Sequence, residues 1–207
     1  MDKDEENWRD AWKAFFKPQR CGLFAIVPTW DREFSPREGE TIISLDPGRA
    51  FGTGGHASTR LCLCALGRLP AAPTILDVGC GSGILGIGCA LRWPAARVVA
   101  VDLDLEAIEV TNENAALNGV AARVTASTTP LAQIPERFAV VVANIQADVL
   151  IAMSAELARH VGSALVLSGI LVEQADSVAA AFVARDMRLA DKLLEDGWCA
   201  LVLEPDW

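Results

Sequence analysis

The stretch TILDVGCGSG, residues 74–83, joins a short apolar run to three glycines that alternate with other residues. The apolar run 74–78 predicts a buried strand, and the residues after the third glycine predict a helix that ends before Pro94. Glycines at 79, 81 and 83 permit a tight turn and let a ligand approach the backbone closely. The helix that follows offers unpaired N–H groups at its first turn. The stretch therefore predicts a strand, a ligand-binding loop and a helix.

The same alternation of strand and helix continues toward the C-terminus. Strands are predicted at 97–102, 123–126, 138–143, 164–168 and 198–203, and helices at 84–93, 104–118, 147–160 and 173–184. Short apolar strands that alternate with helices form βαβ units, which build a parallel sheet covered on both faces. We therefore expect an α/β, Rossmann-like fold with a mostly parallel sheet and helices on both of its faces.

The N-terminal segment follows a different pattern. Aromatic residues from Trp8 to Phe16 recur at helical spacing before Pro18, which predicts a short amphipathic helix, and the polar stretch 30–39 predicts a loop. The helix either packs on the main domain or serves as a linker or partner-facing surface. We expect residues 1–45 to be a linker helix and loop segment, and residues 46–207 to be the catalytic domain.

Composition excludes several functional classes. The net charge of −9 argues against a protein whose main task is to bind nucleic acid. No apolar run approaches the length of about 18 residues that a membrane helix needs, and the acidic N-terminus differs from a signal peptide. The six cysteines form no C-x-x-C pair and the two histidines lack metal-site spacing, so we expect reduced thiols and no metal. These features favour a cytoplasmic protein.

A carboxylate at the end of the second strand suggests a nucleoside ligand. Asp102 lies 23 residues after Gly79, where it could accept hydrogen bonds from the two ribose hydroxyls of an adenosine. Two cofactors compete for this site. Gly81, Gly83 and Gly86 match the G-x-G-x-x-G pattern of NAD sites, whereas Asp77 just before the loop suits the cationic end of S-adenosylmethionine and would repel a pyrophosphate. A glycine turn without a ligand is the third alternative.

A further stretch carries a family resemblance. LDPGRAFGTGGHAST, residues 45–59, resembles the D-P-G-x-A-F-G-T-G-x-H-x-(S/T)-T signature of the ribosomal-protein methyltransferases that modify the eleventh protein of the large subunit. Residues 75–85, 142–145 and 167–174 resemble other stretches of that family, and the N-terminal aromatic segment is similar to its linker. The chain has Gly55 where the family usually has Thr and Ala57 where it usually has Pro. It begins in the linker-like segment, so we expect the family's N-terminal substrate-recognition domain to be absent.

The resemblance implies a class I S-adenosylmethionine-dependent methyltransferase fold with an antiparallel final strand. It also implies that S-adenosylmethionine donates a methyl group to an amine, either a lysine side chain or an N-terminal amino group, of a protein substrate such as the stalk-base ribosomal protein. The resemblance assigns cofactor contacts to Thr59 and Gly79, ribose binding to Asp102, and a place beside the methyl group to Asn144. The expected cofactor site also includes Phe51, Thr53, His56, Asp77, Gly81 and Gly83.

Two roles stay open at this point, and so do two other functions. His56 either lines the cofactor pocket or braces its loop, and Asn144 either orients the amine as the catalytic residue or holds the cofactor or the strand end. An NAD-dependent oxidoreductase would need a hydride-transfer constellation, which we do not find in the sequence. A non-catalytic cofactor-binding module would keep the pocket without transferring a methyl group.

Overall fold

The structure is a computed structural model that describes residues 16–46 and 55–206. Its centre is a seven-stranded sheet with the strand order β6-β5-β4-β7-β8-β10-β9. The strands of this sheet are β4 (Thr74–Val78), β5 (Arg97–Val101), β6 (Val124–Ser127), β7 (Phe138–Asn144), β8 (Val161–Leu171), β9 (Met187–Glu195) and β10 (Trp198–Pro205). The first five run parallel, whereas β10 is antiparallel to both β8 and β9. The expected mostly parallel sheet and its antiparallel final strand are both confirmed.

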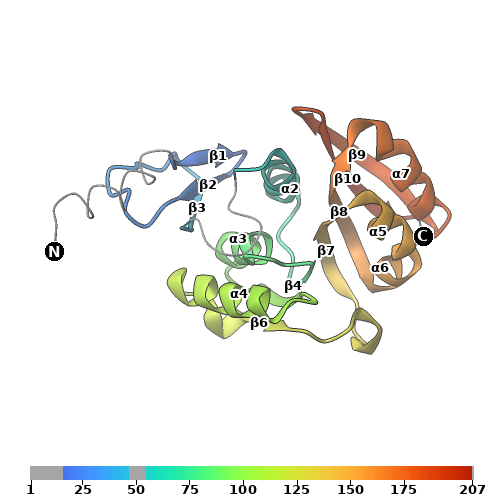
Figure 1. Cartoon of the computed structure of the whole chain (residues 1–207), viewed down its shortest axis with the longest axis horizontal. Coiled ribbons are helices and arrows are strands. Elements are labelled where there is room, and N and C mark those ends of the chain that lie inside the picture. The colour runs from blue at the N-terminus through green and yellow to red at the C-terminus, as the bar shows by residue number, and fades with distance from the viewer. Residues whose placement is uncertain (1–15, 47–54, 207) are drawn as a thin grey trace.

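Helices cover both faces of this sheet (Figure 1). The helices are α2 (Ala57–Arg68), α3 (Ile84–Arg92), α4 (Leu105–Leu117), α5 (Ala147–Ala152), α6 (Ser154–His160) and α7 (Ala175–Val183). Alternate residues of β7 separate the two cores: Val140 and Val142 pack with α2 and α3, whereas Val141 and Ala143 pack with the helices α5 to α7. A strand whose two faces are both apolar is typical of a central parallel strand.

Short 3-10 turns and small shifts account for most differences from the predicted elements. The predicted helix 147–160 is divided at Met153 into α5 and α6. The turns are η2 (Ala121–Arg123), η3 (Leu131–Gln133) and η4 (Val172–Gln174), and η4 forms the start of the predicted helix 173–184. The strand predicted at 164–168 extends over Val161–Leu171.

The strand β9 was not predicted, because it lies at the edge of the sheet. Of its nine residues only Met187 and Leu193 are buried, and charged Arg188 and Lys192 are among the exposed ones. Charged side chains are common on edge strands, where they discourage pairing with another molecule. The sequence of β9 therefore lacks the alternation of apolar and polar residues that marks a half-buried strand.

Residues 19–44 form a small second sheet that the sequence did not predict. The strand β1 (Gln19–Cys21) pairs antiparallel with β2 (Phe24–Val27), which pairs parallel with β3 (Thr41–Ser44). Phe24 and Ile43 are fully buried in the same core as α2 and α3. The predicted division at residue 45 stays a prediction, but this segment packs as part of the main core. The predicted helix before Pro18 lies outside the described residues, except for Phe16.

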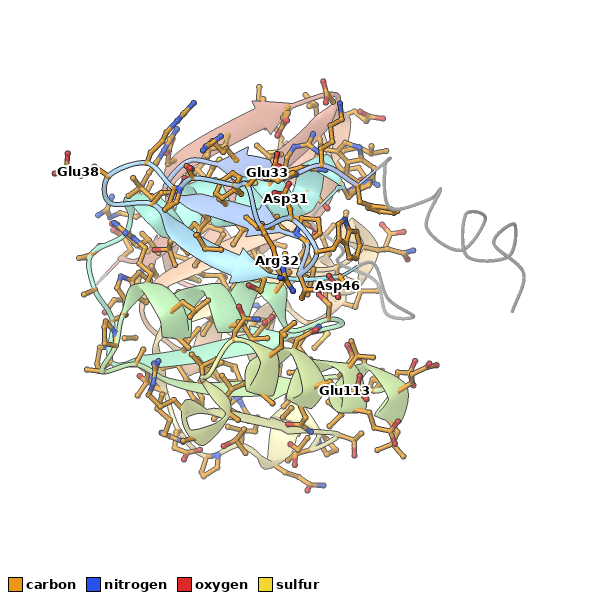
Figure 2. The ribbon with its side chains drawn as sticks, turned by 90° about the vertical axis from the view of Figure 1, so that its left-hand side faces the viewer. Asp31, Arg32, Glu33, Glu38, Asp46 and Glu113 are labelled. Carbon is orange, nitrogen blue, oxygen red and sulfur yellow. The ribbon has the colours of Figure 1, made fainter. Side chains whose placement is uncertain are left out.

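The polar stretch 30–39 lies in the connection between β2 and β3 and contains neither helix nor strand, as predicted. Its charged side chains, with Asp31, Arg32, Glu33 and Glu38 among them, lie at the surface (Figure 2). Asp46 reaches back to the start of this connection, where its carboxylate accepts hydrogen bonds from the backbone N and the Oγ1 of Thr29, both at 2.7 Å.

In the part of the chain that the structure describes, no helix combines the length and the apolar character needed to cross a membrane. The same residues bring together no group of three histidine, cysteine or carboxylate side chains that could hold a metal ion. All six cysteines lie within the described ranges and are free. Burial raises the pKa of the Cys80 thiol to about 12, so it stays protonated and unreactive at neutral pH.

Candidate active site

A cavity of about 650 Å³ opens where the parallel strands β4, β5 and β7 end. In an open α/β sheet, ligands bind in the crevice outside these carboxyl ends. The volume lies within the range of small-molecule sites. The described residues that line the cavity are His56, Ser58, Val78, Gly79, Gly81, Val101, Asp102, Leu103, Thr129, Pro130, Leu131, Asn144, Ile145, Gln146, Val149, Met153, Gly169 and Trp198.

The glycine loop forms one wall of this cavity. Gly79, Gly81 and Gly83 have φ angles of +69°, +54° and +77°, a region that side chains rarely adopt. The backbone N–H of Gly79 donates to the carbonyl of Val101 at 2.8 Å, which ties the loop to the end of β5. Gly79 and Gly81 line the cavity, whereas Gly83 lies behind it, where a Cβ atom would be 2.8 Å from Cγ2 of Thr111.

Asp102 lines the cavity directly after β5. Its Oδ2 accepts a hydrogen bond from the backbone N of Gly81 at 2.9 Å, and its Oδ1 accepts one from the backbone N of Asp104 at 3.1 Å. These two bonds fix the plane of the carboxylate. Each carboxylate oxygen can accept a second bond, so the group can also bind two hydroxyl donors. This capacity fits the ribose role predicted from the sequence.

Asp77 lies beneath the glycine loop and not in the cavity. The residue is 1 % exposed, and its Oδ2 accepts a hydrogen bond from the backbone N of Gly86 at 2.9 Å, in the first turn of α3. Burial raises the pKa of Asp77 from 3.8 to about 7, and the nearby Asp102 adds to this effect. The sequence predicted direct contact with the cationic end of a cofactor. The carboxylate joins β4 to α3, and its Oδ1 has no hydrogen-bond partner among the described residues, so the predicted contact with the cofactor stays a prediction.

Asn144 is the last residue of β7 and lines the cavity. Its Nδ2 donates a hydrogen bond to Oγ1 of Thr59 at 3.3 Å, whereas its Oδ1 is buried with no hydrogen-bond partner among the described residues. Thr59 itself is fully buried in α2 and is not one of the lining residues. The structure thus places Thr59 behind Asn144, where it orients the amide. A buried amide oxygen without a partner is costly and points to a missing donor.

His56 lies between the cavity and the start of α2, and its predicted place in the cofactor site stays a prediction. It lines the cavity, and it also caps α2, because its Nδ1 accepts a hydrogen bond from the backbone N of Ser58 at 3.3 Å. The same Nδ1 lies 2.7 Å from Oγ of Ser58. The imidazole meets the indole of Trp198 edge to face, with 4.5 Å between the ring centroids. The predicted site residues Phe51 and Thr53 lie outside the described residues.

Several lining residues were missed by the sequence reasoning. Trp198 enters the site from β10, and nothing in its sequence neighbourhood marks it as different from a core tryptophan. Thr129 and Leu131 come from the connection after β6. Gly169 had a detectable signal, because a glycine interrupts an apolar strand there. Its φ is +80°, and a Cβ atom would lie 2.4 Å from the carbonyl oxygen of Ile145.

Comparison with known proteins agrees with this geometry. Residues 1–205 match the family model described as Ribosomal protein L11 methyltransferase (PrmA). The ribosomal protein L11 methyltransferase of Geobacter metallireducens is 47% identical over 203 residues, which are 97% of this chain and 67% of that protein. The corresponding protein of Pelobacter propionicus is 44% identical over 206 residues, 95% of this chain and 66% of that protein. The chain thus spans about two thirds of the length of these curated relatives.

Solved structures give the same result. The crystal structure of ribosomal protein L11 methylase from Lactobacillus delbrueckii subsp. bulgaricus has a TM-score of 0.83 and 30% identity, and the match covers 93% of this chain and 100% of that one. A magnesium protoporphyrin IX methyltransferase from Synechocystis, solved with bound S-adenosylmethionine, shares the fold, with a TM-score of 0.57 and 19% identity over 77% of this chain and 86% of that one.

These matches confirm the class I methyltransferase fold and the dependence on S-adenosylmethionine, and none of these relatives supports an NAD-dependent oxidoreductase. The family match covers the linker-like segment, the glycine loop and the final strands alike. The chain therefore belongs to the ribosomal protein L11 methyltransferase family of S-adenosylmethionine-dependent enzymes.

Proposed function

We propose that this chain binds S-adenosylmethionine in the cavity and methylates an amine of ribosomal protein L11, either a lysine side chain or the N-terminal amino group. The observation that carries this proposal is the side chain of Asn144. Its Nδ2 is held by Thr59, and its buried Oδ1 lacks a partner among the described residues. An N–H group of an amine that enters the cavity would supply the missing donor.

The residues at the cavity fit the cofactor. Gly79 and Gly81 present backbone without side chains, and the Asp102 carboxylate is fixed with capacity left for two hydroxyl groups. Apolar side chains such as Val101 and Leu131 would suit an adenine ring. When bound, S-adenosylmethionine supplies a methyl group on a positively charged sulfur, activated for displacement by a nucleophile.

The same lining favours the reactive form of the acceptor. A lysine amine has a pKa of about 10.4 in water and is therefore almost entirely protonated at neutral pH. An apolar environment disfavours the charged ammonium form, and the side chains of Val78, Ile145 and Val149 provide such an environment. No strong base is then required, and the task of the protein is to align the neutral amine. We assign this orienting role to Asn144.

The identity of the acceptor rests on the relatives, which carry the name ribosomal protein L11 methyltransferase. This chain aligns with about two thirds of their length. A ribosomal acceptor would place the reaction in the cytoplasm, where ribosomes are assembled. We take the acceptor to be the protein itself and not the ribosomal RNA, which agrees with the net charge of −9.

Methyl transfer from labelled S-adenosylmethionine tests the proposal, with purified L11 and a whole-cell extract assayed side by side. We expect label in purified L11, and mass spectrometry should locate the added methyl group on an amine. Label in another protein of the extract but not in L11 would refute the proposed acceptor. Binding of S-adenosylmethionine in calorimetry, without label in any protein, would favour a non-catalytic cofactor-binding module. Heat on titration with NAD and none with S-adenosylmethionine would favour an NAD-dependent oxidoreductase.

A further inference from the structure

One arginine joins two distant segments of the chain beside the cavity. Arg60, in the first turn of α2, donates from Nη1 to the carbonyl of Gly55 at 2.6 Å. Its Nε donates to Oε1 of Glu195 at 2.9 Å, and its Nη2 lies 2.7 Å from the same oxygen and 3.4 Å from Oδ2 of Asp196. The guanidinium therefore links the residue before His56 to the turn between β9 and β10.

Both linked segments lead directly to side chains that line the cavity. Gly55 precedes His56, and Asp196 lies two residues before Trp198. The rings of His56 and Trp198 meet edge to face at 4.5 Å, and both residues line the cavity. The α2 helix packs against β8, β9 and β10, and it lies beside this part of the sheet in Figure 1.

Arginine suits this task because its planar fork donates several hydrogen bonds in fixed directions. The Arg60 side chain is 20% exposed and that of Glu195 is 35% exposed, so water screens this pair less than an ordinary surface ion pair. The turn that the guanidinium contacts is tightly constrained, since Asp196 and Gly197 both have positive φ angles, of 49° and 80°. Loss of the arginine would release Gly55 and this turn together.

We propose that Arg60 is a positioning residue for methyl transfer, which holds His56 and Trp198 together as one wall of the cavity and thereby fixes where the acceptor amine enters. This inference rests on the proposed function. The proposed function assigns the ribose and the backbone contacts of the cofactor to Asp102 and the glycine loop, and the printed contacts of Arg60 reach neither of them. Loss of Arg60 should therefore change the use of the acceptor much more than the affinity for the cofactor.

The chain offers a matched control on the same helix. Arg68, in the last turn of α2, donates from Nη1 to Oδ2 of Asp191 on β9 at 2.9 Å. It thus also ties α2 to β9, but its side chain is 64% exposed and neither Arg68 nor Asp191 lines the cavity. Comparing Arg60→Met with Arg68→Met separates the positioning of the wall from a general attachment of α2 to the hairpin.

The experiment measures three quantities for the wild-type chain, Arg60→Met, Arg60→Lys and Arg68→Met. They are amide hydrogen exchange in peptides that cover 55–58 and 195–199, the Kd for S-adenosylmethionine by calorimetry, and kcat/KM for purified L11. For Arg60→Met we expect faster exchange in both peptides and a loss of kcat/KM of about ten- to a hundredfold, because small displacements of a reacting group are costly. The Kd should stay within about twofold, and Arg68→Met should match the wild type.

The two conclusions fail in different ways. If the wild type methylates no L11, the proposed function fails, but the exchange comparison still decides whether Arg60 holds the wall. Equal exchange for Arg60→Met and Arg68→Met would overturn the inference. The inference would also be overturned if Arg60→Met lowered kcat/KM by the same factor in the Trp198→Ala variant as in the wild type, because Arg60 should have little to position once the indole is removed. If Arg60→Met does not fold, Arg60→Lys keeps the charge but loses the planar fork, and it should show the same changes to a smaller extent.

Discussion

Asn144 donates a hydrogen bond from its Nδ2 to Oγ1 of Thr59 at 3.3 Å, although 85 positions separate the two residues along the chain. The bond joins the end of β7 to the first turn of α2 and leaves Oδ1 of Asn144 as the group that needs a donor. The orientation of the Asn144 amide therefore depends on a hydroxyl that does not itself line the cavity.

Replacement of Thr59 by valine should slow methyl transfer and also lower the free energy of unfolding. The valine side chain fills the same space but leaves Nδ2 of Asn144 without its acceptor, so the amide is free to rotate. We expect kcat to fall by about tenfold because the amine is aligned less well, and the free energy of unfolding to fall by about 1–3 kcal/mol, the cost of an unpaired buried donor. Thr59→Ser keeps the hydroxyl and should retain most of the rate, and equal losses in the two variants would contradict this role.

Asp102→Asn should weaken the binding of S-adenosylmethionine. The substitution keeps the size of the side chain but replaces one acceptor oxygen by a donor and removes the charge. We expect the Kd measured by calorimetry to rise by roughly a hundredfold, since hydrogen bonds to a charged group contribute about 1.5–3 kcal/mol each. Asp104→Asn is the control, because Asp104 caps α4 two residues away and asparagine caps a helix equally well. A similar loss in both variants would argue against a ribose contact.

The conformation of the glycine loop predicts the effect of adding a single methyl group. Gly79 and Gly119 both have φ angles of +69°, but a Cβ atom at Gly79 would lie 2.5 Å from Cγ2 of Ile145, whereas one at Gly119 meets nothing within 4 Å. Gly119→Ala should lower the free energy of unfolding by about 1–2 kcal/mol, the cost of the left-handed conformation alone. Gly79→Ala should cost about 1–3 kcal/mol more from crowding and should also weaken cofactor binding. Chemical denaturation of the two variants measures the difference. Equal losses of unfolding free energy would show that the Ile145 side chain moves aside without cost.

Asp77 predicts a pH dependence of stability. Burial raises its pKa in the folded chain to about 7, above the ordinary value of 3.8, so the folded chain holds the proton more tightly than the unfolded chain. The resulting stabilisation is complete below the ordinary value and is lost as the pH rises toward 7. Between pH 5 and pH 7 the free energy of unfolding of the wild type should fall by about 2 kcal/mol relative to that of Asp77→Asn. Parallel pH profiles for the two proteins would contradict a buried, protonatable Asp77.

The sequence was sufficient to predict the central fold because its elements are marked by short runs of neighbouring residues. The apolar runs at 74–78 and 138–143 are buried on both faces in the structure, and the glycine loop has the positive φ angles that its residues predict. Asp102 follows from the spacing between the glycine loop and the end of the next strand, whereas Asn144 was assigned by the family resemblance. These residues could be found without any knowledge of long-range packing.

The remaining features depend on contacts between distant segments. The strand β9 has only two buried side chains, and the strands of residues 19–44 are three or four residues long, so neither shows a periodic pattern. The place of Asp77 beneath the loop could not be predicted, because its carboxylate accepts a hydrogen bond from the backbone N of Gly86, nine residues later. Trp198 reaches the site only because β10 returns beside β8 in the antiparallel direction.

The rate of methyl transfer by Asn144→Ala, measured at saturating S-adenosylmethionine with purified L11, decides whether Asn144 orients the amine. If Asn144 orients the amine, the rate should fall by about a hundredfold, because a misaligned nucleophile loses most of the advantage of proximity. The Kd for S-adenosylmethionine, measured in parallel by calorimetry, should change by no more than a few fold. A rate close to that of the wild type, with the cofactor bound equally well, would rule out this orienting role and would leave Asn144 as a structural residue at the end of β7.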